Sequence, residues 1–405
     1  MPSQERLAAY ADLVVKIGGN VQEGQDAVVV GWIEHAPLMR ALAEASWRAG
    51  ARYVEMSYRD DYGRRSLAEH ASDDALSWSP PHSLARLQDW ADRRVAYLQT
   101  LGDPDPMLMA ALDPVRVGKS EPYEATRLLR RLSNEGHWSR TIVACATEGW
   151  ARQVYGEPDI ERLWDEIFHA VRLDEPDPTA AWKHHIAMLK GRARVLNERR
   201  FDAVHFQGGG TDLMVGLLPE SRWIAATHVT NWGLEHCANM PTEEVFTTPD
   251  RRRTKGVVRA TKPFTWHGYT IGGVEVEFSE GRAVRVDADD GGGFIRSQMQ
   301  ADEGGAFLGE VALVDETTRI PDRIFYNGLF DENVACHIAY GNAYVDAVDD
   351  AEGLSPDELR RRGINVSATH VDFMIGGPQV DVDAVAADGE RVPVMRANRW
   401  VLEAG

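Results

Sequence analysis

A strand, a helix and a second strand follow one another near the N-terminus, and this order permits few folds. Residues 26–33 form an apolar run, residues 37–49 carry apolar side chains at helical spacing, and residues 52–58 form a second strand-like run. Gly50 ends the helix between the two strands. Neighbouring parallel strands need a crossover connection, usually a helix, whereas antiparallel strands can be joined by a tight turn. A strand–helix–strand order therefore indicates a parallel pair. The N-terminal part is therefore predicted to be α/β.

The pattern changes after about residue 236. Up to that point, the further predicted elements are strands at residues 140–145 and 203–206 and helices at residues 161–172 and 179–200. His184 and His185 are expected to be an exposed pair on the last of these helices. We expect two domains, an N-terminal mixed α/β sheet domain at residues 1–236 and a C-terminal α+β domain at residues 237–405.

The C-terminal part has the signature of antiparallel strands. Short alternating segments separated by glycine turns occupy residues 256–263, 269–271, 274–278 and 282–287. Glu280 and Gly281 are predicted to form the hairpin turn between the last two.

The charge balance narrows the class of partner. Lys and Arg number 44 against 63 Asp and Glu, so the net charge is −19 over 405 residues. A chain this acidic is repelled by polyanions, so nucleic acid and anionic membranes are excluded as main partners. No apolar run reaches the roughly 18–20 residues of a transmembrane helix, and the first residues carry no signal-peptide pattern. The three scattered cysteines fit a reduced, cytoplasmic setting.

The common catalytic fingerprints are missing from this sequence. The glycine-rich turn at residues 207–211 completes neither GxGxxG nor GxxxxGK[ST], and neither HExxH nor GxSxG occurs. Candidate catalytic residues must therefore be found in another pattern. Four C-terminal segments rich in carboxylates and histidines stand out, at residues 239–250, 308–314, 329–344 and 369–376.

The last segment places a histidine and a carboxylate side by side. His370 and Asp372 are two residues apart in a predicted strand, so both side chains project from one face. Such a pair is half of a first-row metal site. A hydrogen-bonded His–Asp pair at a sheet surface explains this segment equally well when it is taken alone.

The third segment is predicted to be a helix, with Asp331 as its N-cap. His337 and Tyr344 are seven residues apart and would share one face, with Asn333 one turn before His337. Glu332 would point elsewhere, either as a residue behind the site or as an exposed carboxylate at the helix start.

Two further carboxylates lie in the remaining segments. Glu310 sits within an apolar strand, where an ionised carboxylate needs a cation or a salt bridge. Glu243 and Glu244 are adjacent beside a proline, and one of the two can turn inward. Together these segments offer three carboxylates and two imidazoles, a mixed set that suits two divalent ions about 3.5–4 Å apart.

In content and order, the four segments resemble the thermophilic-aminopeptidase family of cocatalytic metallopeptidases (aminopeptidase T/S-like leucyl aminopeptidases). The stretch NMPTEEVFTTPD at residues 239–250 is the most specific match, and LGEVALV, LFDEN…H and HVDFMIG follow in order. The resemblance is strong over residues 205–385. It implies a C-terminal catalytic domain whose metal ligands are Glu244, Glu310, His337, His370 and Asp372. Within the pair at residues 243–244, the choice of Glu244 rests on the resemblance.

The resemblance also implies a function. It predicts a metal-dependent aminopeptidase that binds two divalent ions per chain (Zn, Co, Mn or Mg) and releases N-terminal residues from short peptides with a free N-terminus. Tyr344 would be the active-site tyrosine, and Glu244 or Glu310 would move the proton of the metal-activated water. A homodimer enclosing the active sites is expected.

Two other functions compete with this prediction. Ring-cleaving dihydroxypyridine dioxygenases resemble this fold, and His337, His370 and Asp372 alone would hold one non-haem iron. Glu244 and Glu310 argue for a second metal and against that reaction. A non-catalytic peptide-binding protein is the third alternative, but it predicts missing ligands, and none is missing.

Overall fold

The structure is a computed structural model that describes residues 2–266 and 269–403. The chain forms two compact units: unit 1 comprises Met1–Lys183 and Thr227–Pro241, and unit 2 comprises His184–Ala226 and Thr242–Gly405. This division differs from the single boundary expected between residues 236 and 237. Residues 184–226 fall in unit 2 because their strands β5 (Ala203–Gly208) and β6 (Thr211–Leu217) pair with each other, and β6 pairs antiparallel with β12 (Pro249–Arg259).

Unit 1 is built on a five-stranded parallel sheet in the order β10-β4-β3-β1-β2. Its strands are β1 (Asp26–Trp32), β2 (Tyr53–Arg59), β3 (Ala96–Leu101), β4 (Ser139–Ala144) and β10 (Asn239–Met240). The predicted strand–helix–strand unit is confirmed, with α2 (Ala36–Arg48) between the parallel strands β1 and β2. The chain steps from β2 back across β1 to β3, as in doubly wound α/β sheets.

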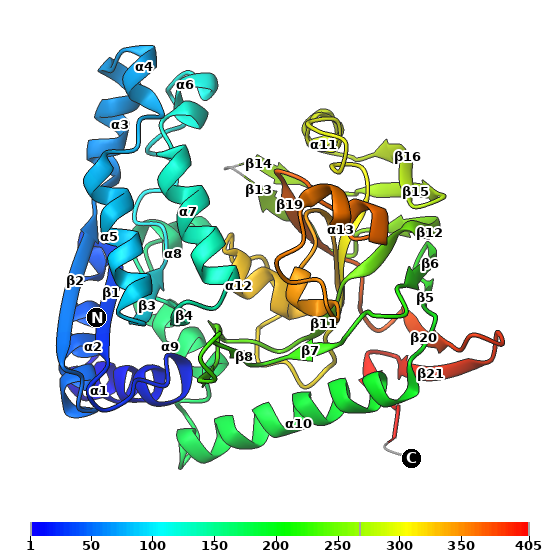
Figure 1. The fold of residues 1–405 in the computed structure, drawn as a ribbon, viewed down its shortest axis with the longest axis horizontal. Coiled ribbons are helices and arrows are strands. Elements are labelled where there is room, and N and C mark those ends of the chain that lie inside the picture. Colours follow the sequence, from blue (N-terminus) through cyan, green and yellow to red (C-terminus); the bar gives the residue numbers. More distant parts are fainter. Residues whose placement is uncertain (1, 267–268, 404–405) are drawn as a thin grey trace. The chain divides into compact units, whose positions relative to one another are not determined.

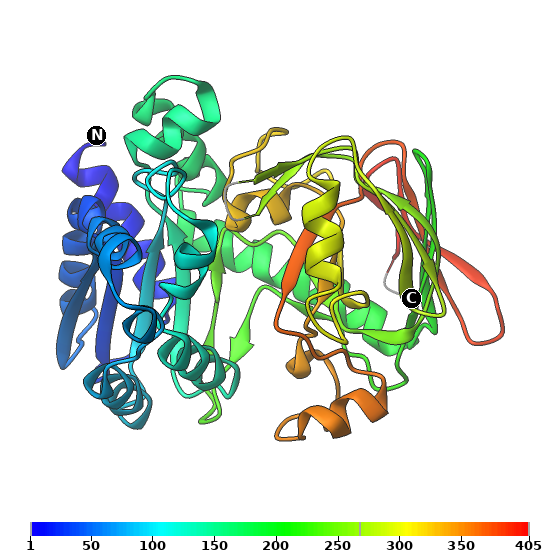
Figure 2. The ribbon, with the colours of Figure 1, turned by 90° about the horizontal axis from the view of Figure 1, so that it is seen from above.

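Helices cover both faces of this sheet (Figures 1 and 2). The helices of unit 1 are α1 (Gln4–Leu13), which runs into a π-helical turn (Val14–Gly18), α2, α3 (Asp61–His70), α4 (Asp73–Leu76), α5 (Pro81–Asp92), α6 (Pro114–Lys119), α7 (Tyr123–Asn134), α8 (Glu148–Tyr155) and α9 (Ile160–Ala170). A small hairpin, β8 (His228–Val229) and β9 (Glu235–His236), belongs to the same unit. The helix α10 (Pro178–Arg199) has residues in both units.

A buried histidine ties the ends of two central strands of unit 1 together. His35 follows β1 in a 3₁₀ turn (Ile33–His35); its Nδ1 lies 2.8 Å from Thr100 Oγ1, and its Nε2 lies 2.8 Å from the carbonyl of Gly102. Because that carbonyl can only accept, Nε2 carries the proton and the neutral ring satisfies both partners. Burial lowers the pKa of His35 to about 4, and the bond to Gly102 only partly opposes this shift.

This histidine makes the stability of the protein depend on pH. The unfolded chain binds the proton at a pKa near 6.5 and the folded chain only near 4, so acid favours unfolding. The contribution of His35 to the free energy of unfolding is complete above pH 6.5 and is lost as the pH falls toward 4. Between pH 7 and 5, His35 alone removes about 2 kcal/mol. Urea unfolding of the wild type and of His35→Gln at both pH values measures this loss. The same change in the free energy of unfolding between pH 7 and 5 in the two proteins would contradict it.

Unit 2 contains two antiparallel sheets. The larger has the order β16-β15-β12-β6-β5-β20-β21-β22, and the smaller has the order β19-β18-β17-β11-β7. The additional strands are β7 (Ile224–Ala225), β11 (Val245–Thr247), β15 (Glu275–Ser279), β16 (Arg282–Asp287), β17 (Leu308–Leu313), β18 (His337–Gly341), β19 (His370–Met374), β20 (Asp381–Val385), β21 (Arg391–Arg396) and β22 (Arg399–Trp400). The antiparallel pair β13 (Phe264–Trp266) and β14 (Tyr269–Ile271) and the helices α11 (Gly292–Met299), α12 (Gly328–Asp331) and α13 (Pro356–Arg362) also belong to the unit.

The predicted antiparallel hairpin is confirmed. Glu280 and Gly281 join β15 to β16, and both have positive φ angles of 48° and 82°, as a two-residue hairpin turn of type I′ requires. No helix in the described part of the chain is both long and apolar enough to span a bilayer.

The helix predicted through residues 329–344 is wrong. The chain forms the short α12, a 3₁₀ turn (Glu332–Val334) and then the strand β18, and the N-cap of α12 is Asn327 rather than Asp331. The carboxylate of Asp331 instead accepts the N–H groups of Phe325 and Asn327. β18 pairs with β17 on one side and β19 on the other, and these tertiary bonds override the helical propensity of an alanine-rich segment.

Candidate metal centre

The predicted ligands meet on one face of three neighbouring strands. Glu310 on β17 lies opposite Ala339 on β18, and Ala339 lies opposite Asp372 on β19. Opposed residues on antiparallel neighbours project from the same face of the sheet. His337 is two residues from Ala339, and His370 is two residues from Asp372, so strand alternation brings both imidazoles to that face as well. The pairing therefore assembles four of the five residues.

Glu244 completes the cluster from the segment before β11, the strand on the other side of β17. Its Oε2 lies 3.1 Å from Nε2 of His337. The ligand atoms form two groups within 4.8 Å: Glu244, Glu310 and His337 in one, and Glu310, His370 and Asp372 in the other. Glu310 belongs to both groups, as a carboxylate that bridges two ions would.

Hydrogen bonds orient both histidines for binding through Nε2. The Nδ1 of His370 lies 2.7 Å from the carbonyl of Asn342, and the Nδ1 of His337 lies 3.2 Å from the carbonyl of Ala335. A carbonyl can only accept, so each Nδ1 carries a proton, and Nε2 is the nitrogen of each ring that faces the carboxylates and would bind a cation once it is deprotonated. Backbone carbonyls orient metal-bound histidines in this way in many proteins.

Several atoms of the cluster are buried without a hydrogen bond. Glu244 Oε2, His370 Nε2 and Asp372 Oδ1 make none, although Nε2 of His370 lies 3.2 Å from Glu310 Oε2 and 3.4 Å from Asp372 Oδ1. Unpaired buried polar atoms are costly. Lone pairs that converge from carboxylates and imidazoles fit first-row divalent ions, so the donor set suits the predicted metals.

The pKa values of the cluster also indicate that its buried carboxylates need positive charge beside them. Burial raises the pKa of Glu310 to about 7, because the carboxylate lies in a fully buried strand. Burial would lower the pKa of His337, but contact with Glu244 and the charges of Glu310 and Asp372 raise it to about 10. Cations would satisfy these carboxylates without protonating the imidazoles.

Tyr344 and Glu332 lie at the same cluster. The ring of Tyr344 is 5.1 Å from that of His370 and 5.2 Å from that of Phe246. Burial and the charges of Glu310 and Asp372 raise the pKa of Tyr344, so its hydroxyl remains a donor at neutral pH. Burial and the charge of Glu244 raise the pKa of Glu332. Of the two alternatives for Glu332, its burial and the charge of Glu244 favour a residue behind the site over an exposed carboxylate at a helix start.

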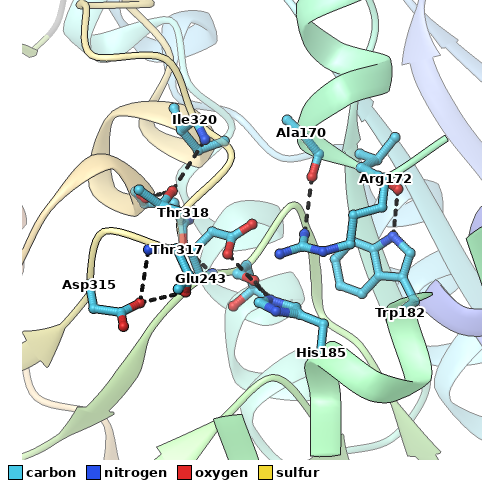
Figure 3. Close-up of polar contacts among 12 residues, drawn as sticks. Ala170, Arg172, Trp182, His185, Glu243, Asp315, Thr317, Thr318 and Ile320 are labelled. Carbon is cyan, nitrogen blue, oxygen red and sulfur yellow. Dashed lines mark hydrogen bonds and ion pairs between the residues drawn. The ribbon is translucent and has the colours of Figure 1, made fainter. Parts of the chain in front are cut away.

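Glu243 projects away from the cluster. Its Oε2 lies 3.4 Å from Nε2 of His185, and both side chains are buried. Figure 3 shows the two side chains directed toward each other. The expectation of an exposed histidine pair is wrong for His185, whose face of α10 packs inward, whereas His184 is exposed. No local pattern in the sequence indicated this contact.

Small residues keep the face of β18 open. Ala339 lies between the two carboxylates, and a Cβ on Gly341 would approach the carbonyl oxygen of Thr369 to 2.2 Å. Gly341 also has a φ of 104°, where other residues are strained. The space between the ligands therefore depends on the side chain at position 339.

Enlarging that side chain should remove bound metal. Ala339→Val places two methyl groups between Glu310 and Asp372. We therefore expect fewer than two ions per chain after dialysis against trace metal. Overpacking should also lower the free energy of unfolding by roughly 1–3 kcal/mol. Elemental analysis measures the ion content. Ile338→Val, on the opposite face of β18, is the matched control and should keep its metal. A folded Ala339→Val protein with as much metal as the control would refute this role.

Comparisons with known proteins identify relatives that match nearly the whole chain. A family model described as thermophilic metalloprotease (M29) matches residues 3–400. Aminopeptidase T from Thermus aquaticus is 40% identical, with 98% of this chain and 99% of that protein covered. Aminopeptidase AmpS from Bacillus subtilis is 35% identical, with 98% and 99% covered.

Two solved structures have a similar fold. Wild-type AmpT from Thermus thermophilus matches with a TM-score of 0.91 at 37% identity, covering 98% of this chain and 99% of that chain. A 2,5-dihydroxypyridine dioxygenase from Pseudomonas putida matches with a TM-score of 0.52 at 14% identity, covering 100% and 99%. The second likeness concerns the fold alone.

Proposed function

The chain belongs to the thermophilic metalloprotease family (M29), and we propose that it is a metal-dependent aminopeptidase with a dinuclear centre. It releases N-terminal residues from short peptides that have a free N-terminus. The observation that carries this proposal is the pair of ligand groups that share Glu310. The unit 2 residues that hold this centre make up the catalytic, metal-binding part of the chain.

The metal ligands in this proposal are Glu244, Glu310, His337, His370 and Asp372. Two divalent ions (Zn, Co, Mn or Mg) bound there would polarise the scissile carbonyl and lower the pKa of a water molecule toward neutrality. Glu244 or Glu310 accepts the proton of that water and passes it to the leaving amine. Tyr344 donates its hydroxyl hydrogen bond to the oxygen that becomes negative. The acidic chain does not repel a cationic peptide N-terminus.

The direct test of the reaction is hydrolysis of leucine p-nitroanilide by chelator-treated protein. We expect no activity without metal and restored activity with Co²⁺, Zn²⁺ or Mn²⁺. The control is the same chelator-treated protein given buffer alone, with its fold checked by circular dichroism. Intact protein that stays inactive with every metal would contradict the proposal.

The second candidate, a single-iron dioxygenase, has less support. Its three ligands would be His337, His370 and Asp372, but this leaves Glu244 and Glu310 without a cation in a buried site. A non-catalytic peptide-binding protein likewise leaves the converging lone pairs unexplained. Metal stoichiometry separates the three: two ions for the peptidase, one iron for the dioxygenase and none for the binding protein.

Tyr344→Phe should keep the metal and lose most of kcat. Its hydroxyl is proposed to stabilise the oxyanion, and the loss of one such donor costs about 2.7–4 kcal/mol, or roughly 10²–10³-fold in kcat. The measurement is kcat on leucine p-nitroanilide at full metal occupancy. Tyr340→Phe is a matched control, because its buried hydroxyl makes no hydrogen bond. A Tyr344→Phe protein with the kcat of this control would disprove the oxyanion role.

The state and location of the protein are part of the same proposal. We expect a cytoplasmic protein, since Cys145, Cys237 and Cys336 are buried and none is in a disulfide. We also expect a homodimer. An edge strand, β2, with exposed Tyr53 and Tyr58 is compatible with association between chains.

A further inference from the structure

Asn333 is a buried side chain that uses both ends of its amide. Its Oδ1 accepts the main-chain N–H of Glu243 at 2.7 Å, and its Nδ2 donates to the carbonyl of Leu329 at 3.0 Å. Its own carbonyl accepts the hydroxyl of Thr318 at 2.8 Å. Asn333 precedes His337 by four residues. It therefore ties the main chain next to Glu244 to the segment that leads into β18.

His185 holds the same stretch of main chain from α10. Its Nε2 lies 2.8 Å from the carbonyl of Thr242 and 3.4 Å from Oε2 of Glu243. The carbonyl can only accept, so Nε2 carries the proton and one N–H group faces both oxygens. Figure 3 shows this imidazole beside Glu243. His185 thus fixes the residue before Glu243 and also the direction of the Glu243 side chain.

The two contacts determine where Glu244 points. Residues 242–244 belong to no strand and directly precede β11, so their main chain is held by these contacts rather than by strand pairing. With Glu243 directed at His185, Glu244 is directed at His337, and its Oε2 lies 3.1 Å from Nε2 of that residue. Glu244 and His337 belong to the same ligand group, so the hydrogen bonds of Asn333 and His185 act on the geometry of that group.

We propose that Asn333 and His185 are positioning residues that prearrange the Glu244–Glu310–His337 group for its ion. The inference rests on the proposed dinuclear centre. The other group is oriented differently, because His370 is held by the carbonyl of Asn342. Loss of the Asn333 or His185 contacts should therefore weaken one of the two metal sites and spare the other.

The test is calorimetric titration of chelator-treated, full-length protein with Co²⁺ alone. The wild type should show two binding events. Asn333→Ala should weaken one of them by about 10–100-fold, the usual effect of removing a partner behind a metal ligand, and leave the other unchanged. In an Asp372→Ala background, which damages the second group, Asn333→Ala should weaken the event that remains.

Asn197→Ala is the matched control. Asn197 also bonds the main chain through both ends of its amide. Its Nδ2 donates to the carbonyl of Trp223 at 2.9 Å, and its Oδ1 accepts the main-chain N–H of Trp223 at 2.7 Å. It lies in unit 2 but is not one of the centre's residues. This variant should lose comparable stability in the metal-free protein and keep both Co²⁺ affinities.

A pair of variants at His185 provides an independent measurement if Asn333→Ala does not fold. His185→Phe removes the N–H group and should weaken the same Co²⁺ event, whereas His185→Gln can still donate to Thr242 and should restore most of the affinity. Folded Asn333→Ala or His185→Phe protein with both wild-type affinities would overturn the inference. Equal weakening of both events would also overturn it, because that indicates a general structural role. A wild type that binds fewer than two ions would instead contradict the proposed function itself.

Discussion

The structure of this centre depends on a carboxylate buried in an apolar strand. Glu310 lies in β17, in which every residue is buried, and its burial raises its pKa to about 7. A charged group in such a place is stable only when cations or hydrogen-bond donors face it. The neighbouring strands supply two imidazoles and the carboxylate of Asp372. Within the cluster, Glu244 Oε2, His370 Nε2 and Asp372 Oδ1 make no hydrogen bond. The arrangement is costly without a cation, and the proposed pair of divalent ions would offset that cost.

Antiparallel pairing provides the geometry that this chemistry needs. The register of β17, β18 and β19 places Glu310, Ala339 and Asp372 in one row, and strand alternation adds His337 and His370. Ligands on paired strands are held more rigidly than ligands on loops, which suits the proposed centre, where two ions would be kept at a fixed separation. Glu244 alone comes from an irregular segment. The main chain beside it is bonded instead by the side chains of Asn333 and His185.

The sequence predicted those parts of the molecule that depend on local pattern. The parallel β1–α2–β2 unit and the Glu280–Gly281 hairpin follow from periodicity and turn chemistry, and both are confirmed. The five proposed ligands were identified through a family resemblance, and the structure places them in two groups that share Glu310. The helix through residues 329–344 was wrong, because pairing with two strands outweighs an alanine-rich pattern. The buried position of His185 and the approach of Glu332 to the centre arise from tertiary packing, which no local pattern encodes.

The measurement that tests the central claim most directly is anomalous X-ray diffraction from crystals grown with Co²⁺ or Zn²⁺. The account predicts two anomalous peaks per chain about 3.5–4 Å apart, with the carboxylate of Glu310 between them. One peak should lie against Glu244 and His337, and the other against His370 and Asp372. A single peak held by His337, His370 and Asp372, with Glu244 and Glu310 turned away from it, would contradict the dinuclear centre.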